Sequence, residues 1–287
     1  MMNIIGRKKI FLTISGLLIL VSLVAMFVFG FKQGIDFVGG TLWQIELQAT
    51  KAELQEFLPE AIITEQAEAG AFLIRLQNIS EDDHQSLLSQ LESKHGEVDE
   101  LSFESIGPAI GGELRGKAMT ALVLVLVGIS LYIAFVFRKV SKPVSSWKYG
   151  LITLVTLFHD AVIPTGLLAV LGYFSDVTLD TSFIVAILVV MGFSVHDTIV
   201  VFDRIREGLS LQRSPKFDFD VLVNDSVNQT ITRSINTSFT LLLVLIALYF
   251  LGAASLQYFV LTIIVGTIAG TYSSIFVASP LLTFWKK

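Results

Sequence analysis

Six long apolar windows, each nearly free of charged residues, constrain this chain more than any other feature of its sequence. They cover roughly residues 10–31, 118–137, 150–174, 181–202, 231–252 and 256–282. A helix needs about 20 apolar residues to cross the hydrocarbon core of a bilayer. Only 16% of the residues are charged, against about 25% in ordinary soluble domains. The sequence therefore predicts an α-helical polytopic membrane protein with six transmembrane helices and argues against a soluble enzyme.

Lysine and arginine residues in the short connections set the expected orientation. They occur in residues 7–9, 138–148, 204–233 and 286–287, whereas the connections 175–180 and 252–255 contain none. Because basic residues near helix ends stay on the cytoplasmic side, we expect both termini in the cytoplasm. The large loop between the first and second helices is then extracytoplasmic.

That loop carries the charge and the pattern of a separate exported domain. Sixteen acidic and three basic residues lie between Asp36 and Glu113. Residue alternation predicts strands at 41–48, 62–66, 72–77 and 98–106, and helical spacing predicts helices at 51–58 and 80–96. The resulting βαββαβ order is that of a ferredoxin-like α+β domain. We expect His84 and His95 on its surface helix or at the end of that helix, in structural roles.

The expected organisation has three parts. Residues 1–31 form the cytoplasmic N-terminus and the first transmembrane helix, and residues 32–116 form the exported domain. Residues 117–287 form transmembrane helices two to six, with a cytoplasmic loop at 204–232. Within that loop, the amphipathic stretch 219–227 is predicted to lie on the membrane surface.

Ionisable side chains at membrane depth are costly, so each one present is a candidate functional group. Asp160 and Asp197 lie about 15 and 9 Å from the cytoplasmic ends of their windows, at about 1.5 Å per helical residue. Arg233, Asn236 and Thr237 share one face of the fifth window. An ion pair between Asp197 and Arg233 is plausible, with Thr237 one turn deeper. Such a pair either handles a proton or is a static contact that fixes helix register.

The polar residues beside these aspartates have alternative roles. Asp160 handles protons directly or acts in helix packing or motion. His159 and His196 should point about 100° away from their neighbouring aspartates. Each of them forms an interhelical hydrogen bond, the role we favour, or titrates near neutral pH. In the sixth window, the small residues Gly266, Gly270 and Ser274 recur at a spacing of four, which predicts a helix-packing seam.

Several other kinds of chemistry lack the residues they need. The chain has no cysteine, no phosphate-binding loop and a net charge of −5, which exclude disulfides, an ATP-driven step and a cationic nucleic-acid surface. Ser194 and His196 face different sides of one helix, so they do not form a nucleophile and base. The two His-Asp dipeptides lack the surroundings of a metal site. We expect no enzyme activity, no metal and no cofactor.

Four motifs together resemble a known family. They are Gly-Ile-Asp-Phe-Val-Gly-Gly at 34–40, Glu-Ser-Ile-Gly-Pro at 104–108, Val-His-Asp-Thr-Ile-Val-Val-Phe-Asp-Arg at 195–204, and Arg-Ser-Ile-Asn-Thr-Ser at 233–238. The chain resembles the SecF branch of the SecD/SecF family of protein-export membrane proteins, within the RND superfamily. The family signature maps onto Gly34, Asp36, Gly39 and Gly40. Six spans would make half of an RND-type bundle.

This resemblance implies a function in the bacterial cytoplasmic (inner) membrane. Such a chain pairs with SecD, associates with the SecYEG channel and often with YajC, and contacts lipid and the translocating polypeptide. It uses the proton motive force to promote late steps of protein export, with protons as its coupling ion. Asp197, Arg233 and Thr237 would be the proton-coupling positions. Two rival functions are a passive chaperone subunit of the translocon and a small-molecule efflux subunit of the RND type.

Overall fold

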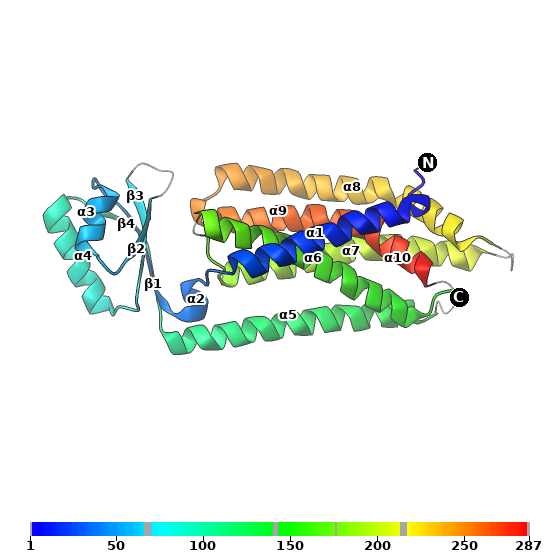
Figure 1. Ribbon diagram of the computed structural model, residues 1–287, viewed down its shortest axis with the longest axis horizontal. Helices are drawn as coiled ribbons and strands as arrows, with labels where there is room; N and C mark the ends of the chain where they lie inside the picture. The colour runs from blue at the N-terminus through cyan, green and yellow to red at the C-terminus, as the bar shows by residue number, and fades with distance from the viewer. Residues whose placement is uncertain (1, 66–69, 140–142, 176, 213–216, 286–287) are drawn as a thin grey trace. The chain divides into compact units, whose positions relative to one another are not determined.

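Among the residues it describes, the computed structural model contains six helical stretches that are long and apolar enough to cross a membrane (Figure 1). The structure describes residues 2–65, 70–139, 143–175, 177–212 and 217–285. The spans are η1 and α1 (Ile5–Arg7, Lys8–Phe29), α5 (Pro108–Val136), α6 (Ser146–Ser175), α7 (Thr181–Leu211), α8 (Phe219–Leu251), and a last stretch of α9 (Gln257–Ser273), the π-helical η4 (Ser274–Ala278) and α10 (Ser279–Phe284). The prediction of six spans is confirmed.

The segment expected as a loop at 204–232 is mostly helical, which corrects the prediction. Helix α7 continues to Leu211, and α8 begins at Phe219. The apolar residues Phe219, Val223 and Val227 are buried inside the protein, so they do not form a surface helix facing lipid. A hydropathy window detects only the bilayer-length part of a helix. Here polar contacts extend α8, including a cap in which Asp218 accepts from the Asp220 N–H at 2.9 Å.

The chain divides into two compact units. One comprises residues 32–120 together with 178–181, and the other comprises the remaining residues. Some residues used for the orientation argument, among them Lys142, Arg213 and Lys216, lie outside the described part of the chain, as does residue 66 at the end of an expected strand.

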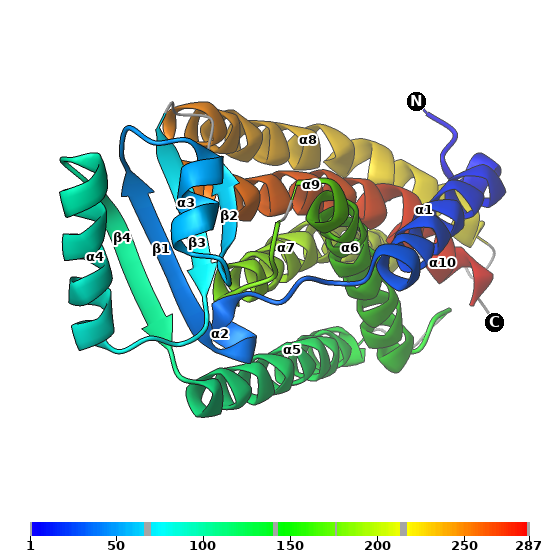
Figure 2. The ribbon, with the colours of Figure 1, turned by 60° about the vertical axis from the view of Figure 1, so that its left-hand side comes forward.

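The first unit contains a four-stranded antiparallel sheet (Figure 2). The elements follow one another as α2 (Ile35–Val38), β1 (Gly40–Glu46), α3 (Lys51–Phe57), β2 (Ile62–Glu65), β3 (Ala71–Leu76), α4 (Glu81–His95) and β4 (Asp99–Ile106). The strand order is β2-β3-β1-β4. From β1 to β4 the chain order is the expected βαββαβ.

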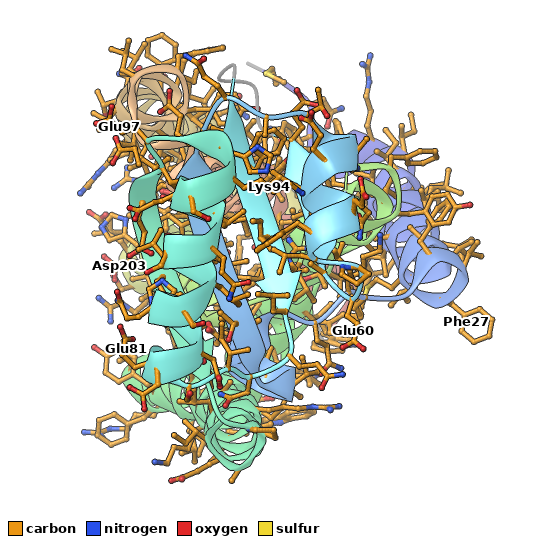
Figure 3. All side chains as sticks on the ribbon, turned by 90° about the vertical axis from the view of Figure 1, so that its left-hand side faces the viewer. Phe27, Glu60, Glu81, Lys94, Glu97 and Asp203 are labelled. Atoms are coloured by element: carbon orange, nitrogen blue, oxygen red, sulfur yellow. The ribbon has the colours of Figure 1, made fainter. Side chains whose placement is uncertain are left out.

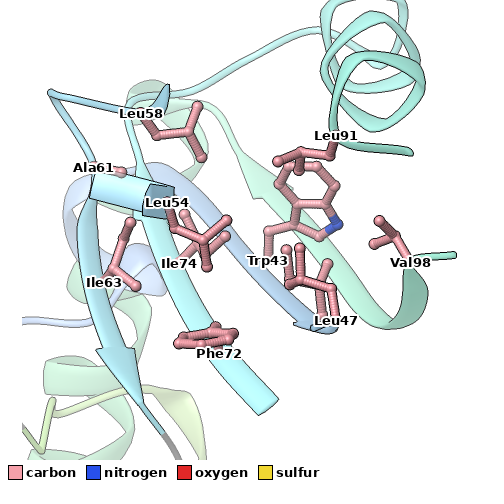
Figure 4. Close-up of a cluster of buried hydrophobic side chains, with 11 residues drawn as sticks. Trp43, Leu47, Leu54, Leu58, Ala61, Ile63, Phe72, Ile74, Leu91 and Val98 are labelled. Carbon is pink, nitrogen blue, oxygen red and sulfur yellow. The ribbon is translucent and has the colours of Figure 1, made fainter. Parts of the chain in front are cut away.

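Helices α3 and α4 cover the sheet, and in Figure 3 they lie side by side in front of the strands. Leu54 of α3 and Leu91 of α4 are fully buried with Trp43, Phe72 and Ile74 of the strands (Figure 4). Helix α3 starts at a Thr50 and Glu53 capping box, and α4 starts at an N-cap serine and ends at a glycine with φ of 87°. These local signals explain why the predicted helix boundaries are nearly correct.

His84 is buried in this core, so the expectation of a surface position is wrong. Its Nε2 lies 2.6 Å from the Glu100 carboxylate, and its ring stacks on Phe103 with centroids 3.7 Å apart. Trp43 Nε1 donates to the same Glu100 carboxylate at 2.9 Å. A polar residue of α4 is thereby accommodated against the sheet because a carboxylate partner reaches it.

The predicted small-residue seam is confirmed at Gly266 and Gly270. A Cβ at Gly266 would lie 2.3 Å from a Val190 methyl, and one at Gly270 would lie 2.9 Å from the Ser194 Cβ. Helices α7 and α9 therefore approach more closely than any larger side chain would allow. With the two helices this close, Ser194 of α7 and Ser273 of α9 both donate to the carboxylate of Asp160 in α6.

Candidate functional site

Asp197 lies in α7 with 1% of its surface exposed. The Ser238 hydroxyl of α8 donates to its carboxylate at 3.5 Å, and that hydroxyl lies 2.5 Å from the Thr271 hydroxyl of α9. The neighbouring His196 is largely exposed, with Nδ1 4.0 Å from the Asp197 carboxylate. The buried carboxylate thus has hydroxyl partners on two other helices.

The expected ion pair between Asp197 and Arg233 is not formed. In this part of α8 the buried side chains are Ser234 and Ser238, whereas Arg233 and Thr237 are exposed. Successive side chains on a helix are rotated by about 100°. The predicted positions, Arg233 and Thr237, each precede a buried serine by one residue and therefore face another direction. The Thr237 hydroxyl donates to the Arg233 carbonyl of its own helix. The sequence does contain a signal for the buried face of α8, because Ser234 and Ser238 are four residues apart and so lie on one side of the helix.

Arg233, Asn236, Thr237 and Thr240 form an exposed polar stripe on α8. Hydrophobic side chains such as Phe239 flank it, exposed on the same helix. An arginine facing lipid is energetically costly. The arrangement leaves these polar side chains accessible to another polypeptide.

Asp160 is the centre of a second buried network. Its carboxylate accepts hydrogen bonds from the Ser194 hydroxyl of α7 and, at 2.7 Å, from the Ser273 hydroxyl of α9. His159 Nδ1 lies 2.7 Å from the other carboxylate oxygen. His159 therefore contacts the neighbouring aspartate directly, contrary to the expectation that it points away. The Asp160 carboxylate thus links α6, α7 and α9. This contact gives Asp160 a role in helix packing.

Ser194 and Ser273 were not identified as site residues from the sequence. Ser194 could have been found, because it precedes Asp197 by three positions and so shares its helical face. Ser273 lies 113 residues from Asp160 in the chain, and nothing in the sequence indicates that these two side chains are in contact.

Further buried polar atoms lie in the same helices. The His159 Nε2, Thr198, Ser234 and Thr267 side-chain atoms have no hydrogen-bond partner among the described residues. A buried polar atom without a partner is costly, and such atoms gather at functional sites or beside water. Within the described ranges, no group of three or more histidine and acidic residues is placed to hold a metal ion.

The signature glycines and Asp36 occupy one short segment after α1. Gly34 is buried at a backbone contact with Leu179, and Asp36 accepts a hydrogen bond from the Thr181 N–H at 2.8 Å. Gly39 and Gly40 have φ of 79° and 133°, values that only glycine adopts readily. The signature therefore has a structural basis in backbone conformation and close packing.

The chain matches two family descriptions. Residues 86–287 match the C-terminal region of the protein export membrane proteins SecD/SecF, and residues 24–52 match the SecD/SecF GG motif. The protein translocase subunit SecF of Thermobaculum terrenum is 40% identical, with alignment over 100% of this chain and 94% of that protein. The SecF of Anaerolinea thermophila is 34% identical over 100% of this chain and 94% of its own length.

A longer relative and its crystal structure extend the comparison. The protein translocase subunit SecDF of Thermus thermophilus is 39% identical, and the alignment covers 94% of this chain and 37% of that protein. The crystal structure of SecDF, a translocon-associated membrane protein from that organism, matches with a TM-score of 0.84 and 34% identity, over 99% of this chain and 38% of that chain. The SecDF structure in the super-membrane-facing form matches with a TM-score of 0.71 and 35% identity over the same shares.

These relatives align with nearly the whole chain, through both the GG motif and the helices that carry the two aspartates. The chain is a multi-pass membrane protein and belongs to the SecD/SecF family of protein-export membrane proteins.

Proposed function

We propose that this chain is a SecF-type subunit that uses the proton motive force to promote late steps of protein export. It acts in the bacterial cytoplasmic membrane with both termini in the cytoplasm and residues 32–116 outside. It carries out no enzymatic reaction and needs no cofactor, and the proton is its coupling ion. Its partners are SecD, the SecYEG channel, YajC and the translocating polypeptide.

The observation that carries this proposal is the environment of Asp197. A hydroxyl both donates and accepts, so the Ser238 side chain suits an ionised carboxylate and a protonated one alike. The carboxylate is buried in α7, among helices with small residues at their contacts. Gain and loss of a proton at Asp197 can therefore occur without leaving an unpaired buried group.

We retain Arg233 and Thr237 as proton-coupling residues and propose that they act by pairing with the partner subunit SecD. They lie on the exposed stripe of α8, where a SecD helix with an acidic side chain would pair with them. The SecDF relative supports this arrangement, since this chain corresponds to only 37% of it and its name joins SecD with SecF.

The driving force is large enough to shift a conformational equilibrium. Moving one elementary charge through 100 mV is worth about 2.3 kcal/mol, which changes a two-state ratio by nearly 50-fold. We propose that protonation of Asp197 from the outside displaces α7 and re-orients the exported domain. Release of the proton to the cytoplasm resets it.

The exported domain is proposed to have a ferredoxin-like fold. The βαββαβ chain order and the strand order β2-β3-β1-β4 support this proposal. Two helices packed on one face leave the other face and the edge strands for interactions with partners.

Asp197→Asn tests the proposal in cells or vesicles whose only copy of the chain carries the substitution. We expect loss of the gradient-dependent part of precursor export, with normal abundance and normal SecD binding. Asp203→Asn is the matched control, because Asp203 lies on the same helix but is exposed and paired with Arg206. Normal gradient-dependent export in the Asp197 variant would favour the passive chaperone alternative.

A further inference from the structure

The segment after α1 is joined by its backbone to the connection that precedes α7. The Gly34 N–H donates to the Leu179 carbonyl at 2.7 Å, and the Leu179 N–H donates to the Lys32 carbonyl at 2.8 Å. These bonds form a parallel bridge between Gln33 and Leu179. A Cβ at Gly34 would lie 3.2 Å from the Asp180 Cβ. The two stretches of chain are therefore in direct contact at this point.

Asp36 adds a side-chain contact to this junction. Its carboxylate accepts from the Thr181 N–H at 2.8 Å and also from the Thr181 hydroxyl. Thr181 is the first residue of α7, where backbone N–H groups have no partner within the helix and a negative charge is favoured. The N-terminus of α7 is thus capped by a residue that lies 145 positions earlier in the chain.

The same segment is held tightly to β1 and to the start of α5. A Cβ at Gly39 would lie 2.7 Å from the Pro108 Cα, and one at Gly111 would lie 2.9 Å from the Gly39 nitrogen. Gly40 begins β1 four residues after Asp36. The backbones approach too closely for side chains to lie between them. Asp36 therefore has little freedom to move relative to the sheet.

We propose that Asp36 is a coupling joint that transmits displacement of α7 to β1 and α5. This inference rests on the proposed function, in which protonation at Asp197 displaces α7. Thr181 and Asp197 are sixteen residues apart on one continuous helix, about 24 Å along its axis. Asp36 is a positioning residue, because it holds the end of the helix and exchanges no proton with Asp197.

The first test removes the joint. We expect Asp36→Ala to lower gradient-dependent export about ten-fold, the effect of losing one charge-assisted helix cap. Thr181→Val should also lower gradient-dependent export, whereas Thr181→Ser should leave export near the wild-type level because serine keeps the hydroxyl that donates to Asp36. Asp82→Ala is the control, since Asp82 is an exposed carboxylate in the first turn of α4. Abundance and SecD binding are measured for every variant.

The second test replaces the joint with a covalent bond. The chain has no cysteine, and the Cβ separation of 3.2 Å at Gly34 and Asp180 needs to lengthen by only a few tenths of an ångström to reach the roughly 3.5–4.5 Å of a disulfide. The double variant Gly34→Cys with Asp180→Cys should form a disulfide when the full chain is oxidised in membranes. Gly107→Cys with Asp180→Cys should not, because no atom lies near a Cβ at Gly107.

Rescue by this disulfide separates a joining role from any other role of the carboxylate. In the Asp36→Ala background, the oxidised 34–180 pair should restore export, and reduction of the same sample should abolish the rescue. A disulfide that forms without restoring export would overturn the proposal, as would normal export by Asp36→Ala. Failure of the disulfide to form would overturn the geometry of the joint. Normal export by Asp197→Asn would instead refute the proposed function, and the disulfide result would still report on the joint.

Discussion

Removal of one hydroxyl from the Asp160 network should destabilise the helix bundle measurably. Ser273→Ala deletes the α9 donor that lies 2.7 Å from the Asp160 carboxylate. Side-chain hydrogen bonds between membrane helices contribute about 0.6 kcal/mol on average and up to about 1.7 kcal/mol. The Ser273 bond is short and buried, so we expect a loss near the upper end of that range, about 1.5 kcal/mol. For a chain of 287 residues that corresponds to a decrease in Tm of about 2.5 °C.

The adjacent Ser274→Ala is a matched control. The Ser274 hydroxyl donates to the Thr271 carbonyl within the same helical stretch, at 3.0 Å. Its removal breaks no bond between helices, so we expect a loss of about 0.5 kcal/mol or less. Thermal unfolding of the full chain in lipid nanodiscs compares the two variants directly. Equal Tm values would refute the assignment of Asp160 as the stabilising centre of this bundle.

Two further predictions concern packing and acid stability. Gly266→Ala should destabilise the bundle by about 1–3 kcal/mol through overpacking against Val190, and Val190→Ala in the same chain should recover part of that loss; additive effects in a double-mutant cycle would contradict the contact. Hydrogen bonds from the Thr50 backbone and side chain lower the pKa of Glu53 below its ordinary value near 4.5. The capping stabilisation is therefore complete above that ordinary value and is lost as the pH falls through the lower folded-state pKa. Hydrogen exchange in the first turn of α3 should show this loss in the wild type but not in Glu53→Gln, and identical pH profiles would contradict it.

The membrane spans could be predicted from the sequence because their signal is local. A run of about 20 apolar residues needs no tertiary information to be identified. Helix ends were harder to predict, since α7 and α8 extend beyond their apolar windows into polar segments that are stabilised by contacts with other parts of the chain. Phe219 shows this, because its apolar side chain is covered by protein and gave the pattern of a surface helix.

The aspartates could be predicted as candidates, but their partners could not. Two faces of α8 carry polar residues, and hydropathy does not tell the buried Ser238 from the exposed Thr237. The Asp160 partners lie 34 and 113 positions away, at distances set by the register between helices. The contact between Asp36 and Thr181 depends on tertiary structure in the same way. The sequence motifs identified the family, whereas the geometry of each contact required the folded chain.

The exposed polar stripe of α8 makes the stability of this chain depend on the composition of the membrane around it. A partner that binds the folded chain stabilises it by mass action, in proportion to the logarithm of the partner's concentration. With Arg233 uncovered, the lone chain is the high-energy member of that equilibrium. If a SecD helix covers this stripe as proposed, the Tm of the chain and its lifetime in the cell should rise with the supply of that helix, so that the amount of this chain that persists is set by the amount of its partner.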